Sequence, residues 1–234
     1  MTYARLKEDE KERVAFTGLR ASEYAELLDA FSKACAKLRD EHTISGDARK
    51  RKPGAGRKPI LAKEEDQLLF ILFYLKTYPL QEVMSELFDM PTASVNEWIH
   101  RLLPIVHQAL DDLGVLPERD AHKFAEQQTE RPTGQDIVID GTERRRQRPK
   151  NKDQQTLHYS GKKKTHTDKN VLITERETGR VSYLSQTYPG TAHDKKIADH
   201  EAITYTVDTQ LHKDTGFQGY EPAVSKTHQP KKTT

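Results

Sequence analysis

The segment that most constrains the fold of this 234-residue chain is a short apolar run between two aspartates, Asp136 and Asp140. The three β-branched residues between them predict a short buried strand. This strand would carry Asp140 at its C-terminal end, where Gly141 lets the backbone turn away. A carboxylate at the open end of a central strand can hold a hard cation such as Mg²⁺. Taken by itself, the segment favours the plainer interpretation, a strand that ends in an Asp-Gly turn.

The residues that follow this strand are strongly basic. Arg144 and Arg145 open a stretch that runs to Lys169 and includes Lys162 and Lys163. The formal net charge of the chain is only +2, so an argument for nucleic-acid binding has to rest on where the charges lie. The stretch is too polar to form a core. We expect it to contact the phosphates of a polyanion rather than to recognise sequence.

The composition indicates a soluble protein of a reducing compartment. Cys35 is the only cysteine, which excludes an intramolecular disulfide, and its place on an apolar helical stripe indicates a core residue. The N-terminus lacks the apolar segment of a signal peptide. No apolar run approaches the roughly 18 residues that a membrane span needs. We therefore expect a cytoplasmic protein with no membrane partner.

Apolar residues recur at helical spacing through the first half of the chain. A short helix, a turn and a further helix over residues 80–106 form the helix-turn-helix pattern. The second of these helices would turn Trp98 inward and expose Asn96, His100 and Arg101. Asn and Arg are side chains that recognise base edges well. Many helical domains contain such a turn without binding DNA, so the spacing alone leaves both interpretations open.

A basic, glycine-containing linker precedes this pattern and ends in Arg57 and Lys58. A segment of this kind can lie in a DNA minor groove. A solvated run of charges explains the composition equally well.

The second half of the chain alternates between predicted strands and helices. A hairpin is predicted over residues 170–186, a helix over 191–202, and a weak strand that ends at Asp214. The expected domains are an N-terminal helix with the basic linker (1–57), a helix-turn-helix domain (58–115), a connector (116–134) and an α/β domain (135–234).

Five short motifs carry a resemblance to a known family. They are Asp140-Gly141-Thr142-Glu143, Gln147-Arg148-Pro149, Tyr159-Ser160-Gly161-Lys162-Lys163, His193-Asp194 and Asp214-Thr215-Gly216-Phe217. In this order they resemble the DDE-superfamily transposases of bacterial insertion sequences, in the insertion-sequence-five-like group with its Harbinger-type endonuclease domain. The resemblance implies an α + α/β fold, in which an all-helical helix-turn-helix domain precedes a ribonuclease-H-like domain.

The resemblance also implies a function and a site. The double-stranded terminal repeats of the element would be the partner, in a nucleoid-associated protein. Two divalent ions, Mg²⁺ or Mn²⁺, would serve strand cleavage and transfer. By position, Asp140 matches the first catalytic and metal-binding acid, and Asp214 matches the second. His193 and Asp194 are expected as supporting residues, although Asp194 also suits the first turn of a helix.

The chain departs from the family pattern at the third acid. The resemblance implies a glutamate on a helix well beyond the second aspartate, and the residues after Asp214 predict no such helix. Glu221 precedes Pro222 in a predicted loop, so we do not assign it this role. We therefore expect a C-terminally incomplete α/β domain and a chain that binds DNA without cutting it. The alternatives are a non-catalytic remnant, or the first half of a split transposase completed by a homodimer partner or a second, C-terminal chain.

Overall fold

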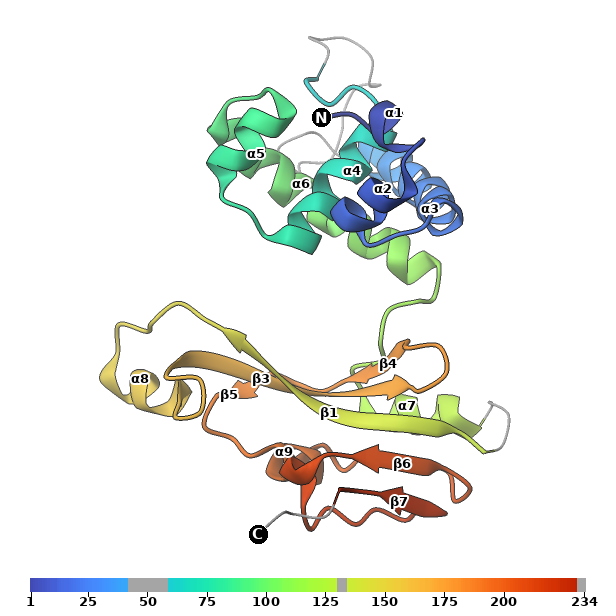
Figure 1. The fold of residues 1–234 in the computed structure, drawn as a ribbon, viewed down its shortest axis with the longest axis vertical. Helices are drawn as coiled ribbons and strands as arrows, with labels where there is room; N and C mark the ends of the chain where they lie inside the picture. Colours follow the sequence, from blue (N-terminus) through green and yellow to red (C-terminus); the bar gives the residue numbers. More distant parts are fainter. Residues whose placement is uncertain (42–58, 130–133, 231–234) are drawn as a thin grey trace. The chain divides into compact units, whose positions relative to one another are not determined.

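The structure, a computed structural model, describes residues 1–41, 59–129 and 134–230 and divides into two compact units, Met1–Val115 and Leu116–Thr234 (Figure 1). The expected fold class is confirmed, because a helical region precedes a mixed sheet with helices. Arg57 and Lys58 lie outside the described residues. None of the described helices is long and apolar enough to cross a membrane.

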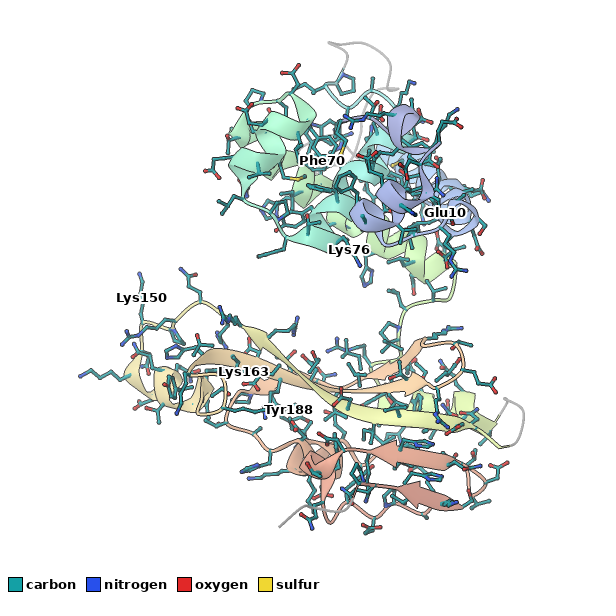
Figure 2. The ribbon with its side chains drawn as sticks, in the orientation of Figure 1. Glu10, Phe70, Lys76, Lys150, Lys163 and Tyr188 are labelled. Atoms are coloured by element: carbon teal, nitrogen blue, oxygen red, sulfur yellow. The ribbon has the colours of Figure 1, made fainter. Side chains whose placement is uncertain are left out.

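The first unit is built from helices around one apolar core. Phe70 lies inside it (Figure 2), with the fully buried side chains of Tyr24, Phe31 and Leu102. Cys35 is buried in the same core, as predicted, and its burial raises the pKa of the thiol to about 12. The helices are α1 (Tyr3–Leu6), α2 (Glu10–Thr17), α3 (Ala21–Glu41), α4 (Glu64–Thr77), α5 (Gln81–Phe88) and α6 (Thr92–Asp112).

The second unit is a mixed sheet with helices packed against it (Figure 1). Its helices are α7 (Ala121–Thr129), α8 (Lys152–His158), α9 (Asp194–Glu201) and the short 3₁₀ helix η1 (Thr215–Phe217). Its strands are β1 (Asp136–Arg145), β2 (Tyr159–Ser160), β3 (Thr165–Glu175), β4 (Val181–Leu184), β5 (Tyr188–Pro189), β6 (Gln210–Lys213) and β7 (Lys226–His228).

The strand pairing follows the layout that the ribonuclease-H-like resemblance implies. The long strands β1 and β3 are antiparallel, and β3 forms the predicted hairpin with β4. The short strand β6 then pairs parallel with the other side of β1, and β7 pairs parallel with β6. A parallel pair requires a crossover connection, and α9 lies in the chain between the hairpin and β6.

The strand β1 is longer than expected. The sequence predicts a strand that ends at Asp140, whereas β1 continues through Gly141 to Arg145. The reason is its partner, because β3 pairs with β1 from Ile137 to Arg145, while β6 pairs with it only as far as Ile139. Asp140 is therefore an internal residue of β1, and the first one beyond the reach of β6.

One face of the sheet is covered by α7 and α9. Phe124 of α7 and Ile197 of α9 share an apolar cluster with Ile139 and other sheet residues. Glu201, the last residue of α9, accepts hydrogen bonds from the hydroxyl groups of Tyr183 and Tyr188. These bonds tie the C-terminal end of α9 to the sheet and fix the position of the whole helix.

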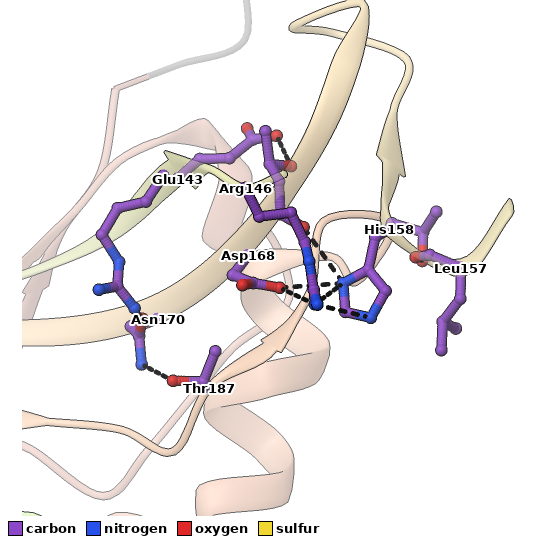
Figure 3. Close-up of polar contacts among 10 residues, drawn as sticks. Glu143, Arg146, Leu157, His158, Asp168, Asn170 and Thr187 are labelled. Carbon is purple, nitrogen blue, oxygen red and sulfur yellow. Dashed lines mark hydrogen bonds and ion pairs between the residues drawn. The ribbon is translucent and has the colours of Figure 1, made fainter. Parts of the chain in front are cut away.

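The basic stretch after β1 contains a buried polar cluster, although the sequence suggested that it was too polar for a core. Thr167 and His158 are buried in it. Asp168 is the polar partner of His158, because its Oδ1 lies 2.9 Å from the His158 Nδ1 and 2.9 Å from the Arg146 Nη1 (Figure 3). The Thr167 hydroxyl has a separate partner in Glu143. Buried polar groups are stable when they have such partners. The cluster joins α8 to β3.

Candidate functional site

Two aspartates lie side by side where β6 ends. The last parallel pair between β1 and β6 joins Ile139 to Lys213, and Asp140 and Asp214 are the residues that follow this pair in the chain. Neighbouring strands lie about 4.8 Å apart. The pairing therefore brings together two residues that are far apart in the sequence.

The two carboxylates are held differently. The Oδ1 of Asp140 accepts a hydrogen bond from the backbone N–H of Gly141 at 2.7 Å. The Oδ1 of Asp214 accepts from the backbone N–H of Gly216 at 2.8 Å and begins η1. Asp214 is thus also the turn residue that its Asp-Thr-Gly sequence indicates.

A third aspartate, Asp194, lies across the glycines that follow these two residues. A Cβ atom added to Gly141 would lie 2.7 Å from the Cγ and the Oδ1 of Asp194. A Cβ atom added to Gly216 would lie 2.9 Å from the Oδ2 of Asp194 and 3.0 Å from the Oδ1 of Asp214. Asp194 and Asp214 therefore both border the space beside Gly216 that a side chain there would fill.

This arrangement gives Gly141 a different role from the expected turn. Its missing side chain makes room for Asp194, which the sequence suggested only as a supporting residue. The signal in the sequence was a glycine directly after Asp140 and another two residues after Asp214. No pattern in the neighbouring sequence indicated that Gly141 and Gly216 both lie against the N-terminus of the same helix.

Asp194 is held in place from two sides. It is the first residue of α9, whose far end is tied to the sheet through Glu201. Its Oδ1 lies 3.4 Å from the Nζ of Lys169 on β3, and the same Nζ donates to the carbonyl oxygen of Ala192 at 2.9 Å. Lys169 and Asp194 are both largely shielded from solvent, which makes their charge interaction stronger than one at an exposed site.

Lys169 and Asp194 line a hollow of about 620 Å³. Residues of the motifs that begin at Asp140, Tyr159 and His193 also line it. Its lining includes Asp140, Glu143, Lys162, Lys163, Lys169 and Asp194. Lysines and acidic residues thus line one space, which suits a phosphodiester together with a cation. Figure 2 labels Lys163 in this unit, together with Lys150 from the segment before α8.

Glu143 stays ionised in this hollow. Partial burial raises the pKa of its carboxyl group, but hydrogen bonds from Ser160 and Thr167 and the charges of Lys169 and Lys163 lower it by more. The Thr167 hydroxyl donates to the Glu143 Oε1 at 2.7 Å (Figure 3). The net pKa lies below that of an ordinary glutamate, so Glu143 adds a negative charge to the site at neutral pH.

The donors at this edge of the sheet fit a hard divalent cation. No three His, Cys, Asp or Glu side chains gather into a metal-binding group among the described residues. Asp194 and Asp214 nevertheless both border the space beside Gly216, and Mg²⁺ commonly takes only one or two protein carboxylates and keeps several waters. Glu221 is engaged in an ion pair, because its Oε1 lies 2.9 Å from the Nζ of Lys213, whose side chain is fully buried.

The helical unit presents a polar surface along α6. Asn96 and His100 are exposed, while Arg101 is half-buried with its guanidinium 5.0 Å from the centre of the Trp98 ring. Trp98 itself is buried, as expected. The polar residues thus share the solvent side of α6, which a recognition helix needs in order to reach base edges.

The other candidate DNA contacts lie on the sheet unit. Arg144 and Arg145 are exposed at the end of β1, and the Arg144 Nη2 donates to the Asn170 Oδ1 at 2.8 Å. Lys162 and Lys163 are exposed in the turn between β2 and β3. Their exposure leaves them accessible to phosphates.

Comparison with known proteins finds two family models. Residues 139–233 match the model described as DDE superfamily endonuclease, and residues 61–112 match the helix-turn-helix of DDE superfamily endonuclease. No curated protein and no solved structure gives a significant match. The two matched ranges contain the aspartate edge and the polar face of α6. Endonucleases of this superfamily generally use divalent metal ions.

Proposed function

Because the chain belongs to the DDE superfamily of endonucleases, with the helix-turn-helix domain of that superfamily ahead of its endonuclease domain, we propose that it is the transposase of a bacterial insertion sequence. In this proposal α6 binds the terminal repeats of the element, and the edge at Asp140 and Asp214 cleaves and transfers DNA strands. The main support is the pairing of β1 with β6, which makes these two aspartates neighbours.

The proposal gives separate roles to the two aspartates and to the lysines of the hollow. Asp140 and Asp214 would hold Mg²⁺ or Mn²⁺, which supplies activation of water or a 3′-hydroxyl and stabilisation of the charged transition state. Lys162 and Lys163 would bind phosphates on either side of the cleaved bond without recognising sequence. Lys169 would keep the carboxylate of Asp194 in place beside that bond.

The proposal is tested by strand cleavage. The chain is incubated with a duplex that carries a terminal repeat of its own element, in Mn²⁺ or in EDTA, beside a duplex of scrambled sequence. We expect nicking of the terminal-repeat duplex that requires Mn²⁺. A chain that neither prefers the repeat nor cuts it would overturn the proposal.

A second candidate, a non-catalytic protein that occupies the element ends, has one observation in its favour. The described residues after Asp214 form the short 3₁₀ helix η1 and the strand β7, so Glu221 does not lie on a helix as the third acid of the family pattern would. Specific binding of the repeat with no nicking in Mn²⁺ would support this candidate. It would also set aside the catalytic half of our proposal.

The face of α6 and the lysine turn should contribute to DNA binding in different ways. We expect Asn96→Ala to weaken binding of the terminal repeat by about 1–3 kcal/mol, with little effect on random DNA, because a base contact discriminates between sequences. Changing Lys162 and Lys163 to Ala should weaken both duplexes and lower the salt dependence of binding, because fewer counterions are released.

The matched control is His107→Ala, an exposed residue further along α6. Fluorescence anisotropy over a range of salt concentrations measures both effects. Equal losses on terminal-repeat and random DNA for Asn96→Ala would show that Asn96 contacts the backbone rather than bases.

A further inference from the structure

We propose that Asp194 is a direct ligand of the divalent ion at this site, beside Asp214. The inference rests on the proposed function, because it concerns the ion that strand cleavage requires. The inference adds to the proposed function that Asp194 itself binds the cation, rather than only supporting the residues that do.

The first argument is the shape of the space around Asp194. Its carboxylate fills the positions that a side chain on Gly141 or on Gly216 would take. The glycines that follow Asp140 and Asp214 therefore both leave room for the carboxylate of Asp194, which belongs to a third element, α9. A residue that served only the first turn of α9 would need no such space, because a helix dipole acts on any acid near the terminus.

The second argument is the state of its two oxygens. The Oδ1 has the Lys169 Nζ at 3.4 Å, a long contact for an ion pair whose amino group also binds the Ala192 carbonyl oxygen at 2.9 Å. The Oδ2 accepts no hydrogen bond from any described residue. This oxygen lies 2.9 Å from the position that a Cβ atom on Gly216 would take, a position that the Oδ1 of Asp214 also borders at 3.0 Å. A carboxylate oxygen without a hydrogen-bond donor remains available to a hard cation, which prefers oxygen ligands.

The third argument is the rigidity of the support. Glu201 ties the end of α9 to Tyr183 and Tyr188, so a movement of the helix that carried Asp194 away would break these part-buried hydrogen bonds. Asp214 is likewise fixed by its hydrogen bond to the Gly216 N–H. A site whose ligands are positioned before binding loses less conformational entropy when the ion arrives.

The test measures binding of Mn²⁺ alone, without DNA and without turnover. The full chain is titrated with Mn²⁺, and the free ion is followed by its electron paramagnetic resonance signal. We expect Asp194→Asn to weaken Mn²⁺ binding by at least about tenfold, as loss of even an indirect metal partner does. Asp214→Asn should have a similar effect.

The matched control is Asp199→Asn, on the same helix, where the aspartate pairs with Lys195 at the surface. It should bind Mn²⁺ as the unchanged chain does. Circular dichroism establishes that all variants are folded. Unchanged Mn²⁺ affinity in folded Asp194→Asn, or no Mn²⁺ binding by the unchanged chain, would overturn the inference.

This readout separates the inference from the proposed function. Mn²⁺ binding that depends on Asp194, in a chain that cuts no DNA, supports the ligand and contradicts the nuclease. Cleavage in a chain whose Mn²⁺ affinity does not depend on Asp194 gives the opposite result.

Discussion

Replacing Asp140 with Asn is expected to reduce Mn²⁺-dependent nicking of a terminal-repeat duplex by more than about 100-fold, because residues that only orient a metal ligand already contribute about 10- to 100-fold. The substitution keeps the shape of the side chain and removes its charge. Asp214→Asn should reduce nicking to a similar extent. Binding of the duplex should be unchanged in both, because the expected sequence recognition resides in α6.

The measurement is single-turnover nicking with enzyme in excess, so that weaker product release does not affect the rate. Asp199→Asn is again the control, since it removes an exposed charge of the same unit without touching the hollow. Nicking that persists in both Asp140→Asn and Asp214→Asn would place the cleavage elsewhere, in this chain or in a contaminating nuclease.

The largest loss of stability in the sheet unit is expected from Gly190→Ala. A Cβ atom at Gly190 would lie 2.1 Å from the Thr167 Oγ1, 2.8 Å from the Thr167 carbonyl oxygen and 2.9 Å from the His158 carbonyl oxygen. Two of these atoms belong to the backbone and cannot rotate away. Overpacking of this kind costs about 1–3 kcal/mol or more. The unit should therefore unfold at a markedly lower urea concentration.

Gly161→Ala supplies the control for this experiment. Gly161 lines the same hollow, but no described atom outside its own neighbours lies within 4 Å of the position of its Cβ. Alanine there should leave the unfolding midpoint unchanged or slightly raised, because it restricts the unfolded chain. Equal midpoints for the two variants would show that the turn at Gly190 relaxes without cost.

The sequence by itself determined the features that depend on local spacing. Helical periodicity placed Trp98 and Cys35 in the core and Asn96 and His100 on the surface, because a helix repeats its faces every 3.6 residues. The order of five motifs indicated the superfamily, and the pattern over residues 170–186 indicated the hairpin between β3 and β4. Each of these signals lies within a few residues of the feature that it predicts.

Only the tertiary structure decided the features that depend on pairing between distant segments. The length of β1 follows from β3, and the adjacency of Asp140 and Asp214 follows from β6, which no local pattern encodes. The position of Asp194 required α9 to be placed over both strand ends at once. The burial of Thr167 and His158 likewise depended on partners elsewhere in the chain. A sequence shows which side chains are present. Contacts between residues that are far apart in the chain form only when the strands pair in the folded protein.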